Sequence, residues 1–317
     1  MSSAPSSSFP QQGIIAALWI PTDREGRPDR SALEAHVTWL RQRGIHGVLA
    51  LGSTGEFPRI DLDQREVAVS LVAELAAPLP VIANVSDIRP KAVAQLGRRA
   101  RALGLAGVAI MPPGFFPNSQ DDLLAHFLHA SDAAQLPVLL YNFPELTGSR
   151  IALETVAAFA DRAPLAGIKQ SGREFDYHRA LIALGKERNF RVFSGADTRL
   201  PEVFALGADG CIGGLVNFVP EPMVRIFDCC KRGVGGDIDA PSAQLREVGS
   251  IIDRLTFFLN VAAGMAARGL DVGEPKSVVS EASWQLYRGI VEDLRQRFGE
   301  WNLEGSPVLM SSNECSP

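Results

Sequence analysis

The chain has 317 residues, of which 46% are hydrophobic and 21% are charged, and its formal net charge at pH 7 is -5. This balance is ordinary for a globular protein and excludes the disordered and fibrous classes. It also argues against a nucleic-acid or membrane-surface partner, because non-specific attraction to either needs a strong basic bias.

The two ends of the chain are predicted to lie outside the fold. Residues 1–12 lack the basic and apolar regions of a secretion signal and are expected to form a disordered lead-in. Residues 299–317 are small and polar towards their end and are expected to form a tail. The four cysteines show neither metal-ligand spacing nor a disulfide framework, so we expect reduced thiols in a cytoplasmic protein.

Eight short apolar runs, each of strand length, recur along the chain. They begin at residues 13, 47, 80, 107, 137, 165, 190 and 209. Segments with helical periodicity separate them, for example at 29–44, 61–76 and 89–104. Continuous apolar runs joined by helical crossovers are typical of parallel strands buried on both faces. Eight such units favour a closed barrel over an open sheet, which more often carries a glycine fingerprint after its first strand.

The fold class that we predict is therefore α/β, a (β/α)₈ TIM barrel over residues 13–232 with extra C-terminal helices over 233–298. Helical patterns cover 241–267 and 277–298, and "GEPKS" separates them because the residue before a proline is disfavoured in a helix. We expect these helices to pack on the barrel rather than to form a second domain.

Catalytic groups in such barrels come from the C-terminal ends of the strands and the loops that follow. Lys169 closes the sixth predicted strand, whereas Lys91, Lys186, Lys231 and Lys276 lie in helical or loop contexts where a solvated ammonium needs no explanation. Lys169 could pack its stem at the rim and extend its ammonium to water. Alternatively, it could be a Schiff-base nucleophile, since desolvation lowers the pKa of a lysine and frees its amine.

Polar groups at neighbouring strand ends favour the second interpretation. Tyr141 ends the fifth strand and could shuttle a proton, although a rim tyrosine in water would look the same. "GSTGE" offers the hydroxyls of Ser53 and Thr54 and closely spaced amides that can bind a carboxylate. A tight turn before a helix would have the same sequence pattern. Glu56 is expected to be structural. The histidines form no ligand pattern, so we expect no metal. We also expect no cofactor.

The stretches "GSTGE", "YNFPELTG" and "GIKQSG", in this order, resemble the dihydrodipicolinate synthase and N-acetylneuraminate lyase family of class I, Schiff-base aldolases. The resemblance runs from about residue 13 to about residue 298. It implies a (β/α)₈ barrel, commonly a homotetramer, that acts on pyruvate or 2-keto acids through a lysine Schiff base.

Carried over by position, the resemblance implies a role for each of several residues. Lys169 would form the imine and Tyr141 would shuttle protons. Ser53 and Thr54 would hold the pyruvyl carboxylate, with Thr54 also in the tyrosine's proton relay. Ile212 would line the pocket with its backbone carbonyl.

Departures from the family's synthases point to a branch of the family. Those synthases usually carry an arginine where this chain has Leu146, and they contribute a tyrosine to a neighbouring subunit from a segment that here holds Phe115 and Phe116. Leu146 and "KQ" are similar to the corresponding motifs of the neuraminate lyase and 2-keto-3-deoxy sugar acid aldolase branch. By resemblance to that branch, the residues of this chain that would bind the rest of the substrate are Ser171, Gly195, Asp197 and Thr198.

We therefore predict a pyruvate-dependent aldolase that cleaves or forms a hydroxylated 2-keto acid, either a 2-keto-3-deoxy sugar acid or a sialic-acid-like compound. Three alternatives stay open: a sugar acid dehydratase with the same imine chemistry, a 4-hydroxy-tetrahydrodipicolinate synthase, and a barrel that binds a keto acid without turnover. The expected partners are this small molecule and further copies of the chain.

Overall fold

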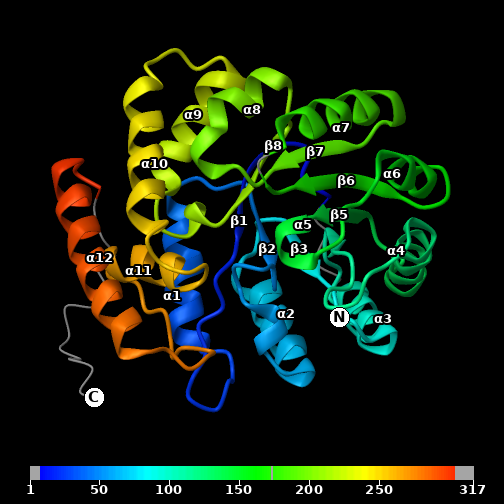
Figure 1. The fold of residues 1–317 in the computed structure, drawn as a ribbon, viewed down its shortest axis with the longest axis horizontal. Coiled ribbons are helices and arrows are strands. Elements are labelled where there is room, and N and C mark those ends of the chain that lie inside the picture. The colour runs from blue at the N-terminus through cyan, green and yellow to red at the C-terminus, as the bar shows by residue number, and fades with distance from the viewer. Residues whose placement is uncertain (1–7, 173, 304–317) are drawn as a thin grey trace.

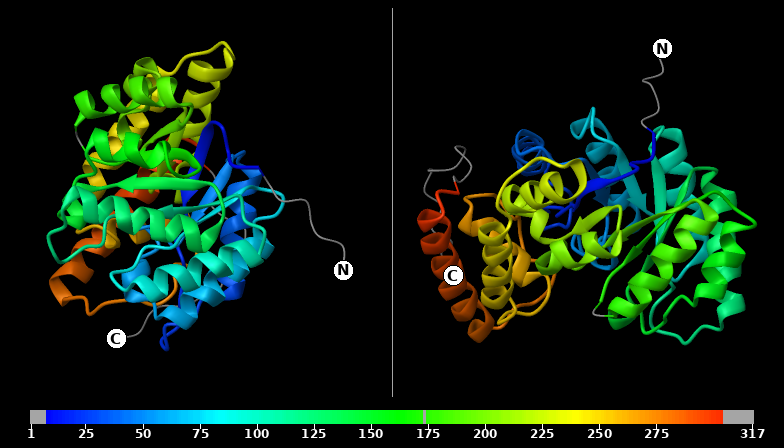
Figure 2. Two further views of the ribbon diagram at one scale, coloured as in Figure 1. Left: turned by 90° about the vertical axis from the view of Figure 1, so that its right-hand side faces the viewer. Right: turned by 90° about the horizontal axis from the view of Figure 1, so that it is seen from above.

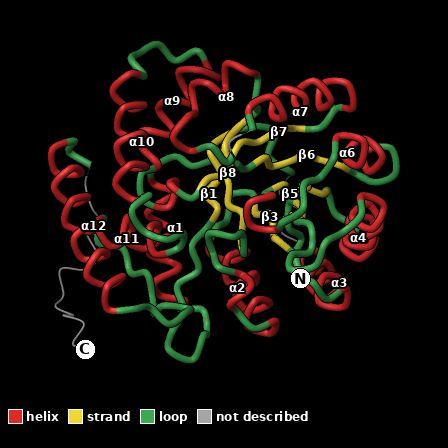
Figure 3. Tube along the Cα trace, viewed as in Figure 1, coloured by secondary structure: helices red, strands yellow, loops and turns green. Residues whose placement is uncertain are grey.

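The computed structural model describes residues 8–172 and 174–303. Eight parallel strands close into a barrel in sequence order, with β8 paired to β1 (Figures 1 and 3). Each strand begins at the first or second residue of a predicted apolar run, and the predicted fold class is confirmed. The strands are β1 Gly13–Ala17, β2 Gly47–Ala50, β3 Val81–Asn84, β4 Gly107–Ile110, β5 Val138–Asn142, β6 Leu165–Gln170, β7 Arg191–Ser194 and β8 Gly210–Gly213.

Helices connect the strands and surround the barrel (Figure 3). They are α1 Arg30–Gln42, α2 Leu62–Leu75, α3 Pro90–Ala102, α4 Gln120–Ala134, α5 Pro144–Thr147, α6 Leu153–Ala160, α7 Phe175–Arg188, α8 Leu200–Leu206 and α9 Pro220–Arg232. α1 illustrates a local start signal, because the Asp29 carboxylate accepts a hydrogen bond from the Ala32 N–H at 3.0 Å. In the described ranges, no helix is both long enough and apolar enough to span a membrane.

The strands are largely apolar because both of their faces are buried. Along β1, Ile14 and Ala16 pack outward against the helices, whereas Ile15 and Ala17 fill the barrel. Along β6, Ile168 packs outward, so the next residue, Lys169, faces the interior. A charged side chain therefore stands where the strand pattern calls for an apolar one.

The C-terminal segment forms three helices where two were predicted. They are α10 Asp239–Ile252, α11 Leu259–Ala267 and α12 Glu281–Glu300, and they lie together on one side of the barrel beside α9 (Figures 1 and 2). The predicted helix 241–267 is interrupted at 253–258, where Phe258 has a φ of 84° that no right-handed helix accommodates. The last helix extends two residues beyond its predicted end at 298.

Part of the predicted lead-in is built into the fold. Phe9 is buried, and its ring lies 6.5 Å from that of Phe193 inside the barrel. It also packs against Gly107, the first residue of β4, so it closes the end of the barrel opposite the strand ends that carry Tyr141 and Lys169. Residues 1–7 of the lead-in and 304–317 of the tail lie outside the described residues.

The prediction of a solvated ammonium is wrong for Lys276. Its side chain is only 3% exposed, and its Nζ lies 3.3 Å from the Glu56 carboxylate and 4.4 Å from the centre of the Trp19 ring. The connection between α11 and α12 folds back onto the barrel, and this places Lys276 against partners more than 200 residues earlier in the chain. Local sequence context cannot reveal such a pairing.

Candidate active site

Adjacent strands bring Lys169 and Tyr141 into contact at the mouth of the barrel. The two residues are paired in the register of β5 and β6. The Lys169 ammonium donates a hydrogen bond of 3.0 Å to the Tyr141 phenol oxygen and lies 4.1 Å from the centre of its ring. Lys169 is 4% exposed and Tyr141 is 1% exposed. The alternative of a rim lysine extending its charge to water is therefore wrong.

The turn after β2 adds a third polar group and two amides. The Ser53 hydroxyl lies 2.8 Å from the Tyr141 phenol oxygen, and the Glu56 N–H closes the turn on the Ser53 carbonyl at 2.9 Å. Ser53 and Thr54 are both buried, and within the described part of the chain neither of their N–H groups donates a hydrogen bond. Because buried amides are almost always paired, two such donors mark a place where a ligand oxygen can bind.

The contact to the tyrosine differs from the predicted relay. Ser53, rather than Thr54, provides the hydroxyl that contacts Tyr141. The Thr54 hydroxyl is directed towards Gly214, where an added Cβ would lie 3.3 Å from its oxygen. Successive residues of the turn point in different directions, and only the first of them reaches the strand that carries the tyrosine.

Asp197 is held rigidly after β7. Its carboxylate accepts a hydrogen bond of 2.8 Å from the Leu215 N–H and one of 3.3 Å from the Cys211 thiol. Burial raises the pKa of Asp197 above its ordinary value, against the opposing effects of these two donors and of the Lys169 charge. The position requires Gly213, since a Cβ there would lie 2.1 Å from the carboxylate. The thiol beneath Asp197 was not predicted.

A cavity of about 590 Å³ joins these groups at the mouth of the barrel. Nine of the ten predicted site residues line it: Ser53, Thr54, Tyr141, Lys169, Ser171, Gly195, Asp197, Thr198 and Ile212. Ser171 lies so close to Gly195 that a Cβ on residue 195 would be 2.3 Å from the serine oxygen. The absence of a side chain at Gly195 therefore allows the two strand ends to lie side by side. Residues selected from five separate stretches of sequence therefore line one space.

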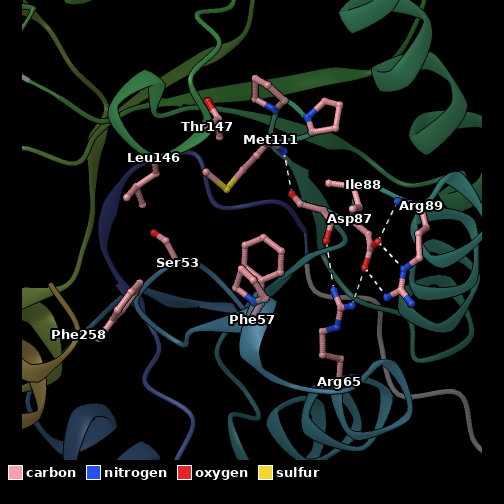
Figure 4. A pocket seen from close by; sticks show the side chains of 15 residues that line it. Ser53, Phe57, Arg65, Asp87, Ile88, Arg89, Met111, Leu146, Thr147 and Phe258 are labelled. Atoms are coloured by element: carbon pink, nitrogen blue, oxygen red, sulfur yellow. Dashed lines mark hydrogen bonds and ion pairs between the residues drawn. The ribbon is translucent and has the colours of Figure 1, made fainter. Parts of the chain in front are cut away.

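Leu146 is the exception. It is 46% exposed and lines a neighbouring cavity of about 620 Å³ instead. Figure 4 shows Leu146 and Ser53 on one side of this second cavity and the ion-paired Arg65 and Asp87 on the other. Ser53 lines both cavities, so it stands at the boundary between them.

Several further residues that line the Lys169 cavity were not predicted. They are Phe143, Glu145, Gly172, Phe175, Ala196, Arg199, Gly214, Leu215, Gly249, Ile252, Asp253, Phe257, Asn260 and Val261. Phe143 and Glu145 belong to the stretch "YNFPELTG" and could have been suspected from it. Those from 249–261 come from the C-terminal helices and the break between them, so reasoning from strand ends could not find them. Across the described residues, no three His, Cys, Asp or Glu side chains gather as metal ligands.

Comparisons relate the chain to known proteins. The model of the Dihydrodipicolinate synthetase family matches residues 10–296. A 4-hydroxy-tetrahydrodipicolinate synthase of Xylella fastidiosa is 34% identical over 237 residues, which are 74% of this chain and 78% of that protein.

Two solved structures share the fold. YagE, a prophage protein of E. coli K12 solved with pyruvate, superimposes with a TM-score of 0.83 at 24% identity, over 92% of this chain and 99% of that one. A catalytic lysine mutant of the Ruminococcus gnavus sialic acid aldolase superimposes with a TM-score of 0.81 at 21% identity, over 91% and 98% of the two chains.

Proposed function

Because the chain belongs to the dihydrodipicolinate synthetase family, it is a Schiff-base-forming carbon–carbon lyase, and we propose that it cleaves or forms a hydroxylated 2-keto acid with pyruvate as the common product or substrate. The proposed substrate is a 2-keto-3-deoxy sugar acid or a sialic-acid-like compound. The observation that carries this proposal is the contact of Lys169 and Ser53 with one phenol, that of Tyr141, inside a single cavity.

The turn after β2 is the proposed binding site for the substrate carboxylate. The N–H groups of Ser53 and Thr54 are buried and unused within the described residues, and two hydroxyls accompany them. Successive amides of this kind bind anions without an arginine. A carboxylate held there keeps the adjacent carbonyl carbon within reach of the Lys169 amine, which lowers the entropic cost of the reaction.

Lys169 and Tyr141 perform the proposed chemistry. The Lys169 amine adds to C2 of the keto acid, and Tyr141 donates a proton as water leaves and the imine forms. The protonated imine nitrogen then accepts the electron pair of the C3–C4 bond, while the ionised phenol takes the proton of the C4 hydroxyl and an aldehyde leaves. Protonation at C3 and hydrolysis of the imine return pyruvate and the free lysine. Ser53 holds the phenol in place throughout.

We also propose a homo-oligomer, with a tetramer as the expected form. Four apolar side chains near the second cavity are exposed: Ile88 by 58%, Phe115 by 89%, Phe116 by 65% and Leu146 by 46%. Exposed apolar patches of this kind usually mark interaction surfaces. Sedimentation velocity of the purified protein checks this, and a monomer at micromolar concentration would contradict it.

A second candidate is 4-hydroxy-tetrahydrodipicolinate synthesis, which the name of the Xylella relative favours. Leu146, in place of an arginine, and the absence of a phenol at Phe115 and Phe116 argue against it. Consumption of aspartate semialdehyde together with pyruvate would identify this activity.

Borohydride reduction in the presence of pyruvate tests the imine, and we expect one covalent adduct in the intact mass. A panel of 2-keto-3-deoxy acids then identifies the reaction. Release of pyruvate indicates the aldolase, whereas a product with its carbon skeleton retained indicates a dehydratase. An unmodified mass, under conditions that label a control aldolase, would overturn the proposal and leave a barrel that only binds its ligand.

A further inference from the structure

The short helix α5 separates the two cavities. Glu145 lines the Lys169 cavity, whereas the next two residues, Leu146 and Thr147, line the second one. Figure 4 shows these two side chains at the second cavity. Adjacent residues of a helix point about 100° apart, so a four-residue helix can present different side chains to two spaces. Glu145 is thereby turned towards the proposed substrate.

The carboxylate of Glu145 rests on the end of β6. A Cβ added to Gly172 would lie 2.5 Å and 2.9 Å from its two oxygens, so only a glycine leaves space for it. Gly172 also has a φ of 103°, which L-residues rarely adopt. It follows Lys169 by three residues, and both residues line the same cavity.

Negative charge predominates around the rest of this cavity. Of its described lining residues, Glu145, Asp197 and Asp253 carry carboxylates, and Lys169 and Arg199 carry cations. Lys169 is committed to the substrate carbonyl in the proposed function. The Arg199 guanidinium lies 3.8 Å from the centre of the Phe175 ring. It also lies 3.6 Å from the carboxylate of Glu202, three residues later in the chain. Carboxylates therefore outnumber cations among the described residues that line this cavity.

We propose that Glu145 determines specificity: it accepts hydrogen bonds from hydroxyls on the part of the substrate remote from C2 and excludes substrates with a second anionic group there. The substrate class is then a 2-keto acid with an uncharged, hydroxylated tail, formed from pyruvate and an aldehyde without carboxylate or phosphate. Hydroxyl-to-carboxylate hydrogen bonds are short and strong, and a like charge at the same place is repelled. This inference rests on the proposed function.

The test compares aldehydes in the direction of addition to pyruvate. Glyceraldehyde is the neutral substrate, and succinic semialdehyde and glyceraldehyde 3-phosphate are the anionic ones. The wild type should show a kcat/KM at least about tenfold higher for glyceraldehyde than for either anion. Glu145→Gln, which keeps size and shape, should reduce this ratio about tenfold, with the change mainly in the KM of the aldehyde. Glu145→Arg should reverse the preference.

Glu154→Gln is the matched control, because Glu154 is exposed on α6 and does not line the cavity. In this control, the ratio of kcat/KM for glyceraldehyde to kcat/KM for the anionic aldehydes should equal that of the wild type. The pyruvate adduct at Lys169 is measured in every variant and reports on an intact site. An adduct of normal yield, with an unchanged aldehyde ratio in Glu145→Gln, would overturn this inference and leave the proposed function standing. A wild type without any adduct would overturn both.

Discussion

Two lysines of this chain are almost fully buried, and their surroundings differ. The Lys276 side chain is 3% exposed and forms an ion pair of 3.3 Å with Glu56. Lys169 is 4% exposed and donates to the phenol of Tyr141, and no described carboxylate lies within ion-pair distance of it. The partner, rather than the burial, therefore separates a lysine that stabilises the fold from one that is available for chemistry.

Lys276 also connects the C-terminal segment to the site. Its partner Glu56 has a φ of 55° and follows Thr54 by two residues, in the turn proposed to bind the substrate carboxylate. Burial lowers the pKa of Lys276, and the Glu56 charge opposes this shift. Arg59 contacts the same carboxylate. Glu56 is thus held from two sides in a backbone conformation that few residues adopt, which fixes the turn.

The largest effect is expected for Lys169→Met. Pyruvate release should fall by about 10⁴-fold or more, because the nucleophile is lost. The melting temperature should stay the same or rise, because an apolar side chain of similar length replaces a buried cation without a carboxylate partner. Steady-state assays and thermal unfolding measure the two quantities. Substantial residual turnover would show that another group forms the imine.

Tyr141→Phe should reduce kcat by about 100-fold, because the proton shuttle is removed while the ring remains. Tyr177→Phe is the matched control. Burial raises the pKa of Tyr177 to about 12, and its hydroxyl donates to the Ile151 carbonyl away from the cavity. The control should lose stability of about 1 kcal/mol and keep its kcat. Equal losses of kcat in both variants would contradict the assignment.

Lys276→Met should lower the free energy of unfolding by about 2 kcal/mol, less than for most buried pairs because Arg59 still contacts Glu56. It should raise the KM for pyruvate several-fold by loosening the turn, and the Lys169 adduct should persist. The double variant with Glu56→Gln should recover more than half of the stability. Lys186→Met, at an exposed site on α7, is the control and should change neither quantity. Loss of the adduct without loss of stability would reverse the roles of the two buried lysines.

The last prediction concerns His36, a buried base whose partner is the Asn217 carbonyl at 3.0 Å. Burial lowers the pKa of His36 to about 4. The unfolded chain, with a pKa of 6.5, binds the proton more readily, so stability should fall as the pH drops from 6.5 towards 4, by about 1 kcal/mol per pH unit. Urea unfolding of the wild type and of His36→Gln measures this. The same slope in both would contradict the role of His36.

The sequence predicts the barrel well because each strand comes from a largely apolar run, and nine of the ten predicted site residues line one cavity at its mouth. It fails where a choice depends on direction or on distant contacts. In "GSTGE" the letters do not tell which hydroxyl meets Tyr141, and in "PELTG" they do not tell that Glu145 and Leu146 face different cavities. The break at 253–258 contains no glycine or proline, so the helical pattern continues through it.

The central claim is that Lys169 forms the imine, and not Lys276, whose side chain is also buried. Borohydride reduction of the wild type with pyruvate, followed by proteolysis and mass spectrometry of the peptides, tests it most directly. We expect the adduct on the peptide that contains Lys169, and an unmodified peptide that contains Lys276. An adduct on Lys276, or an unmodified Lys169 in a protein that turns over its substrate, would contradict the claim.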